Sequence, residues 1–206
     1  MKWATAVGQV ERMVDECARM AGAGPTSSQC PVVQLWVTGS LLGAPRDVDW
    51  VDLAIAVDLP AEKLPWGCTP RAARAWSDLT RMSKNPISAS WRSIHAPLWN
   101  HDIDAAVLVW DSESGARPAA LGAIKAGDGR RHALVRPSGE EYVTRIQDEL
   151  RISLDELRRR TAEYDVVPTT ERLGVRGDAL HRAARAYLEV LEAVEQATPH
   201  EAGTAT

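Results

Sequence analysis

The residue types best suited to chemistry lie at the ends of apolar segments in the first half of this 206-residue chain. Gly39 and Ser40 follow the apolar run that starts at Pro31, and the acidic pair Asp47 and Asp49 precedes the next apolar run. A Gly-Ser bend leaves backbone N–H groups and a hydroxyl available to phosphate oxygens. Two carboxylates two residues apart on a strand project from one face, and Mg²⁺ prefers oxygen ligands. The pattern predicts a site for phosphate and magnesium.

A third carboxylate, Asp104, begins a later apolar segment and would complete this acidic set. Two cations about 3.5–4 Å apart, held by the three carboxylates, would clamp an in-line displacement at phosphorus. Lys84 and Arg92 lie in an irregular stretch, where binding residues concentrate, and we expect them to face the phosphates. The alternative is that Gly-Ser is an ordinary turn and the acids are solvated loop charges.

This order of features resembles the nucleotidyltransferase-fold superfamily, whose pattern is an apolar strand, Gly-Ser, a spacer, Asp-x-Asp and a later third carboxylate. The resemblance spans roughly residues 31–110. It implies that Gly39 and Ser40 cradle a triphosphate, that the three carboxylates bind Mg²⁺, and that Asp104 also takes the proton of the attacking hydroxyl. The implied reaction moves a nucleotidyl group from an NTP to a hydroxyl of a small molecule, RNA or protein.

The whole chain also resembles a family of uncharacterised bacterial proteins. The shared residues are the stretch Trp99-Asn100-His101, the Asp-x-Asp region and the step Leu59-Pro60. This second resemblance implies no activity.

The spacing within the motif departs from the superfamily pattern. Only six residues separate Ser40 from Asp47, whereas the superfamily usually has a longer spacer. A longer spacer moves the pair to Trp50 and Asp52 and removes the first carboxylate. We prefer the register of Asp47 and Asp49 because it keeps both acids. The alternative is a catalytically inactive nucleotidyltransferase-like protein that acts as a binding or interaction module.

Hydrophobic spacing predicts the elements that would position these residues. The predicted strands span 31–37, 47–58 and 102–110, and helices span 3–20, 69–79 and 118–125, with residues 81–101 irregular. Two longer helices follow, the first opened by a capping box of Ser138 and Glu141, the second by Asp178. We therefore expect an α/β (α+β) fold, with a small mixed sheet of nucleotidyltransferase type, flanking helices and a C-terminal helical pair.

The change in pattern near residue 136 predicts the domain organisation. Residues 1–135 would form the nucleotidyltransferase-like core and residues 136–197 a helical extension packed on it. Residues 198–206 would be a disordered tail. A homodimer formed through the C-terminal helices is a further alternative for this part of the chain.

Composition restricts the setting in which the protein works. A formal net charge of −4 argues against general coating of nucleic acid. Three widely spaced cysteines indicate a reducing, cytoplasmic environment without a structural zinc site. The longest apolar runs fall far short of the roughly 18 residues of a membrane span, and the start of the chain lacks the apolar segment of a signal peptide.

Overall fold

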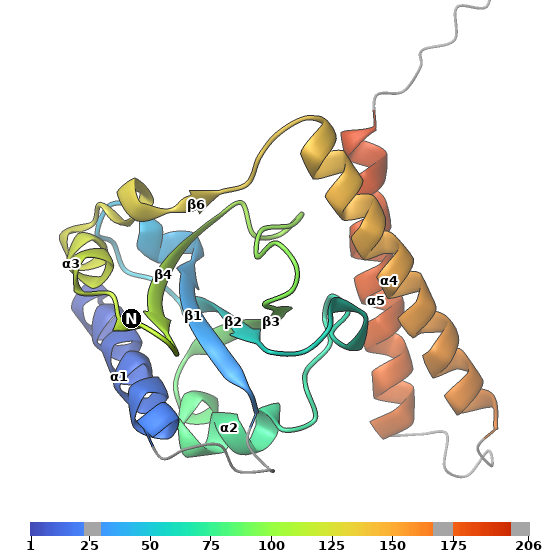
Figure 1. The fold of residues 1–206 in the computed structure, drawn as a ribbon, viewed down its shortest axis with the longest axis horizontal. Helices are drawn as coiled ribbons and strands as arrows, with labels where there is room; N and C mark the ends of the chain where they lie inside the picture. The colour runs from blue at the N-terminus through green and yellow to red at the C-terminus, as the bar shows by residue number, and fades with distance from the viewer. Residues whose placement is uncertain (23–29, 167–174, 199–206) are drawn as a thin grey trace, which may run out of the picture. The chain divides into compact units, whose positions relative to one another are not determined.

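The computed structural model describes residues 1–22, 30–166 and 175–198. Contacts divide the chain into two compact units. The sheet unit comprises residues 1–64 and 69–136, and the helical unit comprises residues 65–68 and the chain from 137 onward. The described residues confirm the expected fold class, a mixed α/β fold with a six-stranded mixed sheet, flanking helices and a C-terminal helical pair (Figure 1).

The sheet has the order β3-β2-β1-β4-β5, and β6 also pairs with β4. Only β2 and β3 are parallel among the described pairs, in the register Val51↔Ile87 to Val57↔Ser93. The strands are β1 (Val32–Thr38), β2 (Val51–Val57), β3 (Ile87–Ser93), β4 (Ala105–Asp111), β5 (Gly115–Ala116) and β6 (Leu134–Val135). The end of β1 and the starts of β2, β3 and β4 therefore meet at one edge of the sheet.

Three helices cover one face of this sheet: α1 (Trp3–Gly22), α2 (Ala73–Leu79) and α3 (Pro118–Ala126). The apolar stripe of α1 and single large side chains, Trp76 of α2 and Ile124 of α3, pack on buried strand residues such as Leu35 and Ile55. Trp76 meets Trp91 of β3 edge to face, with ring centroids 5.5 Å apart. Each such apolar side chain contributes about 1.5–3 kcal/mol when fully buried, so this face holds the main core.

The opposite face is covered by the segment between β3 and β4 rather than by a helix. Leu98 and Ile103 of that segment pack on Ala54 and Ala106, with Trp36 partly buried beside them. This second layer matters for function because it carries polar residues to the sheet edge.

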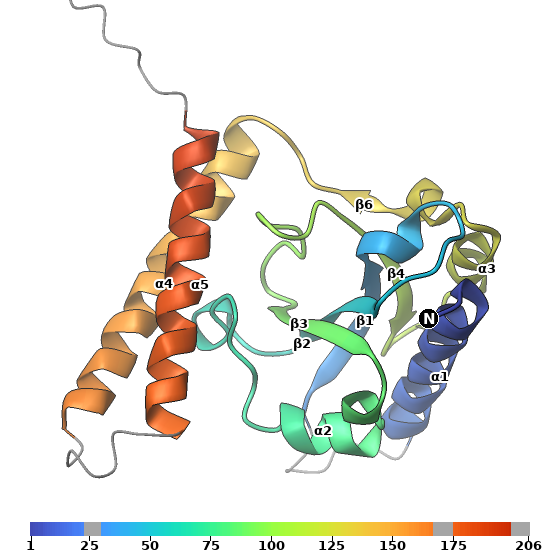
Figure 2. The ribbon, with the colours of Figure 1, turned by 180° about the vertical axis from the view of Figure 1, so that it is seen from behind.

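The stretch 81–101, predicted to be irregular, contains the strand β3, so that prediction is wrong (Figure 2). Alternation was present in Ile-Ser-Ala-Ser-Trp-Arg-Ser, but three of these seven residues are serines, which favour turns as well as strands, and they follow the breaker Asn85-Pro86. The first residues of the second predicted strand are also wrong, because β2 begins at Val51 rather than Asp47. The helix expected from Thr69 begins at Ala73. The backbone N–H of Ala73 donates to the carbonyl of Pro70 and closes the turn that precedes the helix.

The helical unit contains α4 (Glu140–Asp165) and α5 (Val175–Ala197), which pack against each other. The expected capping box at Ser138 is wrong: the N-cap is Gly139, with no side-chain cap bond. The second helix begins at Val175, ahead of the expected Asp178. The expected tail lies outside the described residues except for Thr198. None of the helices in the described ranges is long and apolar enough to cross a membrane.

The short segment 65–68 belongs to the helical unit although it lies far from α4 and α5 in sequence. The Trp66 indole donates to Glu189 of α5 at 3.0 Å, and the Cys68 thiol donates to Glu156 of α4 at 3.7 Å. Glu156 also binds Arg159 and Arg160, with closest N–O distances of 2.7 Å to each. A four-residue loop is thus fixed to both long helices.

Candidate functional site

The Gly39–Ser40 bend directly contacts Asp52 on the neighbouring strand. After β1, the chain turns into the 3₁₀ helix η1 (Gly39–Leu42) with Gly39 at a φ of 64°. A Cβ on Gly39 would lie 2.6 Å from Asp52 Oδ2, so only glycine fits there. The backbone N–H of Ser40 faces Asp52 and acts to lower the pKa of its carboxyl. One of the N–H groups expected to cradle phosphate therefore already faces a carboxylate.

A pocket of about 240 Å³ opens beside this bend, at the sheet edge where four strands end or begin. Its lining contains three carboxylates and two serine hydroxyls, and no basic side chain is among these described residues. The lining residues are Thr38, Gly39, Asp52, Leu53, Ser88, Ser90, Asp102, Ile103 and Asp104. The pocket is therefore acidic and suited to a cation, alone or carrying a ligand.

Asp52 has a pKa above that of an ordinary aspartate. Partial burial raises it most, and the negative charge of Asp102 raises it further. Hydrogen bonds from the Ser40 N–H and the Trp50 side chain act in the opposite direction. The pocket thus contains two interacting carboxylates, whose mutual repulsion a bound cation would relieve.

The loop that brings Asp102 and Asp104 to the pocket is held by two residues. The Asn100 side chain accepts hydrogen bonds from the backbone N–H groups of Asp102, at 3.0 Å, and Ile103, at 2.8 Å. The Arg136 guanidinium donates to the carbonyls of Asn100, at 2.9 Å, and His101, at 3.1 Å. These contacts fix the loop backbone, and hence the positions from which the side chains of Asp102 and Asp104 project.

The predicted ligands Asp47 and Asp49 lie apart from this pocket. Both are exposed in the loop before β2, while Val48 between them is buried and its N–H donates to the carbonyl of Met1. Of the three predicted carboxylates, only Asp104 lines the pocket. The acidic residue that meets the Gly-Ser bend is Asp52, as in the alternative register with Trp50 in the first acidic position.

The two predicted phosphate-binding cations also lie outside the pocket lining. Lys84 is exposed in the 3₁₀ helix η3 (Met82–Lys84). Arg92 is buried in β3, where its guanidinium donates to the Pro97 carbonyl at 3.2 Å. Ser88 and Ser90, which the sequence analysis missed, occupy pocket positions on the same strand. The period-two pattern of β3 would have placed them on one face.

The described residues contain no group of three or more His, Cys, Asp or Glu side chains arranged to hold a metal ion. The pocket is therefore not a preformed protein cage for a metal. Mg²⁺ seldom uses such a cage, since it usually combines one or two carboxylates with water and substrate phosphates. The carboxylates of Asp52 and Asp102 are chemically suited to that kind of binding.

No curated protein and no solved structure matched the chain. A family model did match, over residues 1–196, and it is described as a domain of unknown function. Because the match covers nearly the whole chain, this protein belongs to the family DUF7711.

Proposed function

We propose that the pocket at the Gly39–Ser40 bend binds a magnesium–nucleoside triphosphate complex, and that the chain transfers the nucleotidyl group to a hydroxyl acceptor. The contact of Asp52 with Gly39 and with the Ser40 N–H carries this proposal. In the superfamily that the chain resembles, a Gly-Ser bend and a strand carboxylate meet at the phosphates of the substrate. The acidic pocket beside that contact supports the same assignment.

The size and donor set of the pocket agree with a magnesium–phosphate ligand. Asp52 and Asp102 would hold the ion together with water and phosphate oxygens. A volume of about 240 Å³ is below the roughly 300–1,000 Å³ of sites that enclose drug-sized ligands. The pocket would therefore enclose the ion and phosphates, with the ribose and base outside it.

The reaction requires little covalent chemistry from the protein. Magnesium, when bound, supplies charge neutralisation at the phosphates. The acceptor oxygen forms a bond to the α-phosphorus while the bond to the leaving pyrophosphate breaks. The hydroxyl proton passes to a carboxylate, for which we propose Asp104, since its side chain remains 59% exposed and can release the proton to water. Positioning and electrostatics then account for most of the catalysis.

A second candidate is a protein that binds a ligand in this pocket without transferring any group. Trp50 specifically favours it, because this residue occupies the position of the first carboxylate in the motif and its indole faces Asp52. Because the first acid of the Asp-x-Asp pair is missing, the pocket would bind a single cation, whereas transfer through two metal ions needs a pair.

Binding and turnover measured together distinguish the two candidates. The purified chain would be heated with Mg²⁺ and each of ATP, GTP, CTP and UTP, and pyrophosphate release would be followed with RNA and small-molecule hydroxyl acceptors. Saturating ligand at 100 times its Kd should stabilise the fold by about 2.7 kcal/mol. Transfer predicts both stabilisation and pyrophosphate release, whereas simple binding predicts stabilisation alone. The absence of both with every nucleotide would overturn the proposal.

Substitutions then locate the site. Asp52→Asn and Asp102→Asn should remove the stabilisation by nucleotide, and Asp128→Asn, an exposed acid outside the pocket lining, is the matched control. The double change Asp47→Asn with Asp49→Asn tests the register. If the double variant loses nucleotide binding while Asp52→Asn retains it, the ligands are Asp47 and Asp49, as in the first register.

A further inference from the structure

A short basic turn borders the acidic pocket. The 3₁₀ helix η4 (Gly129–His132) carries exposed Arg130 and Arg131, and it packs against η1. The approach is close: a Cβ on Gly129 would lie 3.2 Å from the Leu42 Cα. The turn and the Gly39–Ser40 bend are therefore held next to each other by backbone packing.

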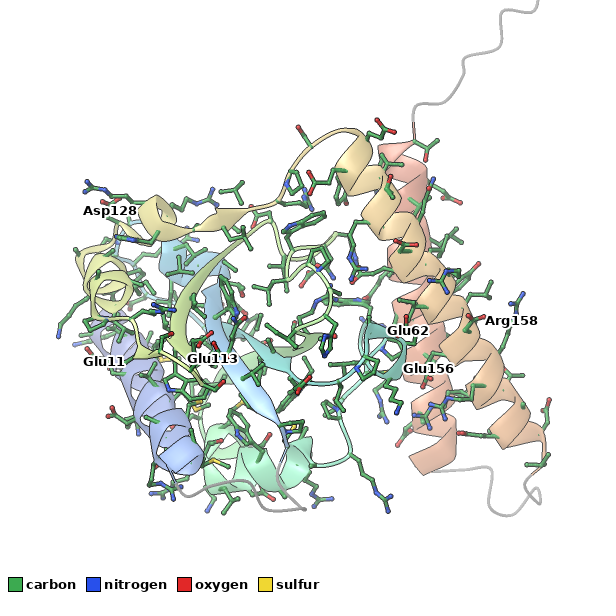
Figure 3. All side chains as sticks on the ribbon, in the orientation of Figure 1. Glu11, Glu62, Glu113, Asp128, Glu156 and Arg158 are labelled. Carbon is green, nitrogen blue, oxygen red and sulfur yellow. The ribbon has the colours of Figure 1, made fainter. Side chains whose placement is uncertain are left out.

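The two neighbouring arginines differ in the carboxylate that each one faces. Arg130 Nη2 lies 3.8 Å from Oδ2 of Asp104, which lines the pocket. Arg131 Nη1 lies 3.8 Å from Oδ2 of Asp128, which is labelled on the same turn in Figure 3 and does not line the pocket. All four side chains are well exposed, with 68% for Arg130 and 77% for Arg131. One guanidinium thus lies beside a carboxylate of the pocket, and its neighbour lies beside a carboxylate outside the pocket lining.

We propose that Arg130 is the phosphate-binding residue of this pocket, an inference that rests on the proposed function. The three carboxylates would repel a polyanionic ligand, so a bound ion must be supplemented by a protein cation. A guanidinium already directed to one carboxylate oxygen can receive a phosphate oxygen at the same place, through two parallel N–H donors. The exchange costs little, because an exposed ion pair contributes little to stability.

Arg130→Gln and Arg131→Gln form a matched pair for the test. Both remove one exposed charge from the same turn, and both remove an ion pair of the same length. Calorimetric titration with Mg²⁺ and the triphosphate that binds wild-type protein most tightly would give Kd for each. We expect Arg130→Gln to raise Kd at least about tenfold, because it removes the charged hydrogen bonds to phosphate, and Arg131→Gln to change it less than about twofold.

A ligand series shows whether Arg130 acts on phosphate. The effect of Arg130→Gln should be largest for the triphosphate, smaller for the monophosphate and absent for the nucleoside. Arg130→Lys should restore part of the affinity, since lysine keeps the charge but loses the paired donors. The unfolding temperature without ligand, equal for both variants, shows that the fold is unchanged.

The outcomes separate this inference from the proposed function. Wild-type protein that binds none of the nucleotides overturns the proposed function, and the role of Arg130 with it. Wild-type binding with an unchanged Kd in Arg130→Gln overturns only the role of Arg130. Equal weakening by Arg130→Gln and Arg131→Gln also overturns it, because the effect is then one of general surface charge.

Discussion

Gly39 and Asp52 are in direct contact although twelve residues lie between them in sequence. The glycine has a left-handed φ of 64°, and its Cα lies so near the carboxylate that a Cβ would stand 2.6 Å from Oδ2. Conformation and space therefore both require glycine at this position. Any side chain at residue 39 must displace Asp52 and hence the wall of the pocket.

Gly39→Ala should lower the free energy of unfolding by about 1–3 kcal/mol, because it adds backbone strain and a clash with Asp52. Urea unfolding measures the change. Gly122→Ala in α3 is the control: nothing lies within 4 Å of its Cβ position, and alanine in a helix should raise stability by up to about 1 kcal/mol. Equal stability of Gly39→Ala and wild type would contradict the close contact.

Asp52→Asn should stabilise the protein at pH 7. The folded-state pKa of Asp52 is raised, so its contribution to stability is fully present below the ordinary carboxyl pKa of about 3.9 and is lost as pH rises through the folded value. Asparagine does not ionise, so the variant does not lose this stability as pH rises. The urea midpoints of variant and wild type, followed from pH 7 to pH 3.5, should converge on acidification.

Asp102→Asn should give a smaller gain in the same direction, because it removes the like charge that raises the pKa of Asp52. A gain in stability from either variant, combined with a loss of ligand binding, is the trade-off expected of a binding site. If Asp52→Asn instead destabilises the protein, and does so more strongly as pH rises to 7, the pKa of Asp52 is lowered rather than raised on folding.

Trp50→Asp should increase the affinity for Mg²⁺, because it supplies the carboxylate missing from the pair with Asp52. One added charge within about 4 Å of a divalent ion is worth roughly tenfold in Kd. The tryptophan is 55% exposed, so its replacement leaves the main core intact. Stabilisation against heating, titrated with Mg²⁺, measures the effect. Trp50→Asn is the uncharged control, and an equal gain with asparagine would exclude a charge effect.

Glu156→Gln should lower the free energy of unfolding by about 1–3 kcal/mol. This carboxylate of α4, labelled in Figure 3, is only 7% exposed and binds Arg159 and Arg160. Its replacement by a neutral amide leaves both guanidinium groups without the negative charge of Glu156. Glu163→Gln is the matched control. Glu163 binds the same two arginines but is 47% exposed, and its change should stay within about 0.5 kcal/mol. Thermal unfolding of the full chain compares the two.

Local patterns were sufficient to predict the elements with strong hydrophobic periodicity. The helix α1, the strand β1 and the end of α3 at Gly127 follow from side-chain spacing and from one left-handed glycine. The strand β3 was missed because serines occupy three of its seven positions and Asn85-Pro86 precedes it. Its stability comes from pairing with β2 and from the Trp91 contact, both of which are tertiary.

The candidate site was harder to predict because its register depends on distant contacts. Asp47 and Asp49 have the better sequence pattern, yet burial of Val48 turns both of them toward solvent. Asp102 reaches the pocket through the Asn100 turn, which Arg136 holds from another part of the chain. No short-range spacing encodes either arrangement.

The loop that contains Trp66 and Cys68 has a consequence for dividing this protein into fragments. Because it packs on α4 and α5, neither compact unit is a continuous stretch of chain. A fragment that stops at residue 136 would keep this loop but lose Glu156 and Glu189, the acceptors of its thiol and its indole N–H. Expressing the sheet by itself would thus require a redesigned 65–68 connection as well as a new C-terminus.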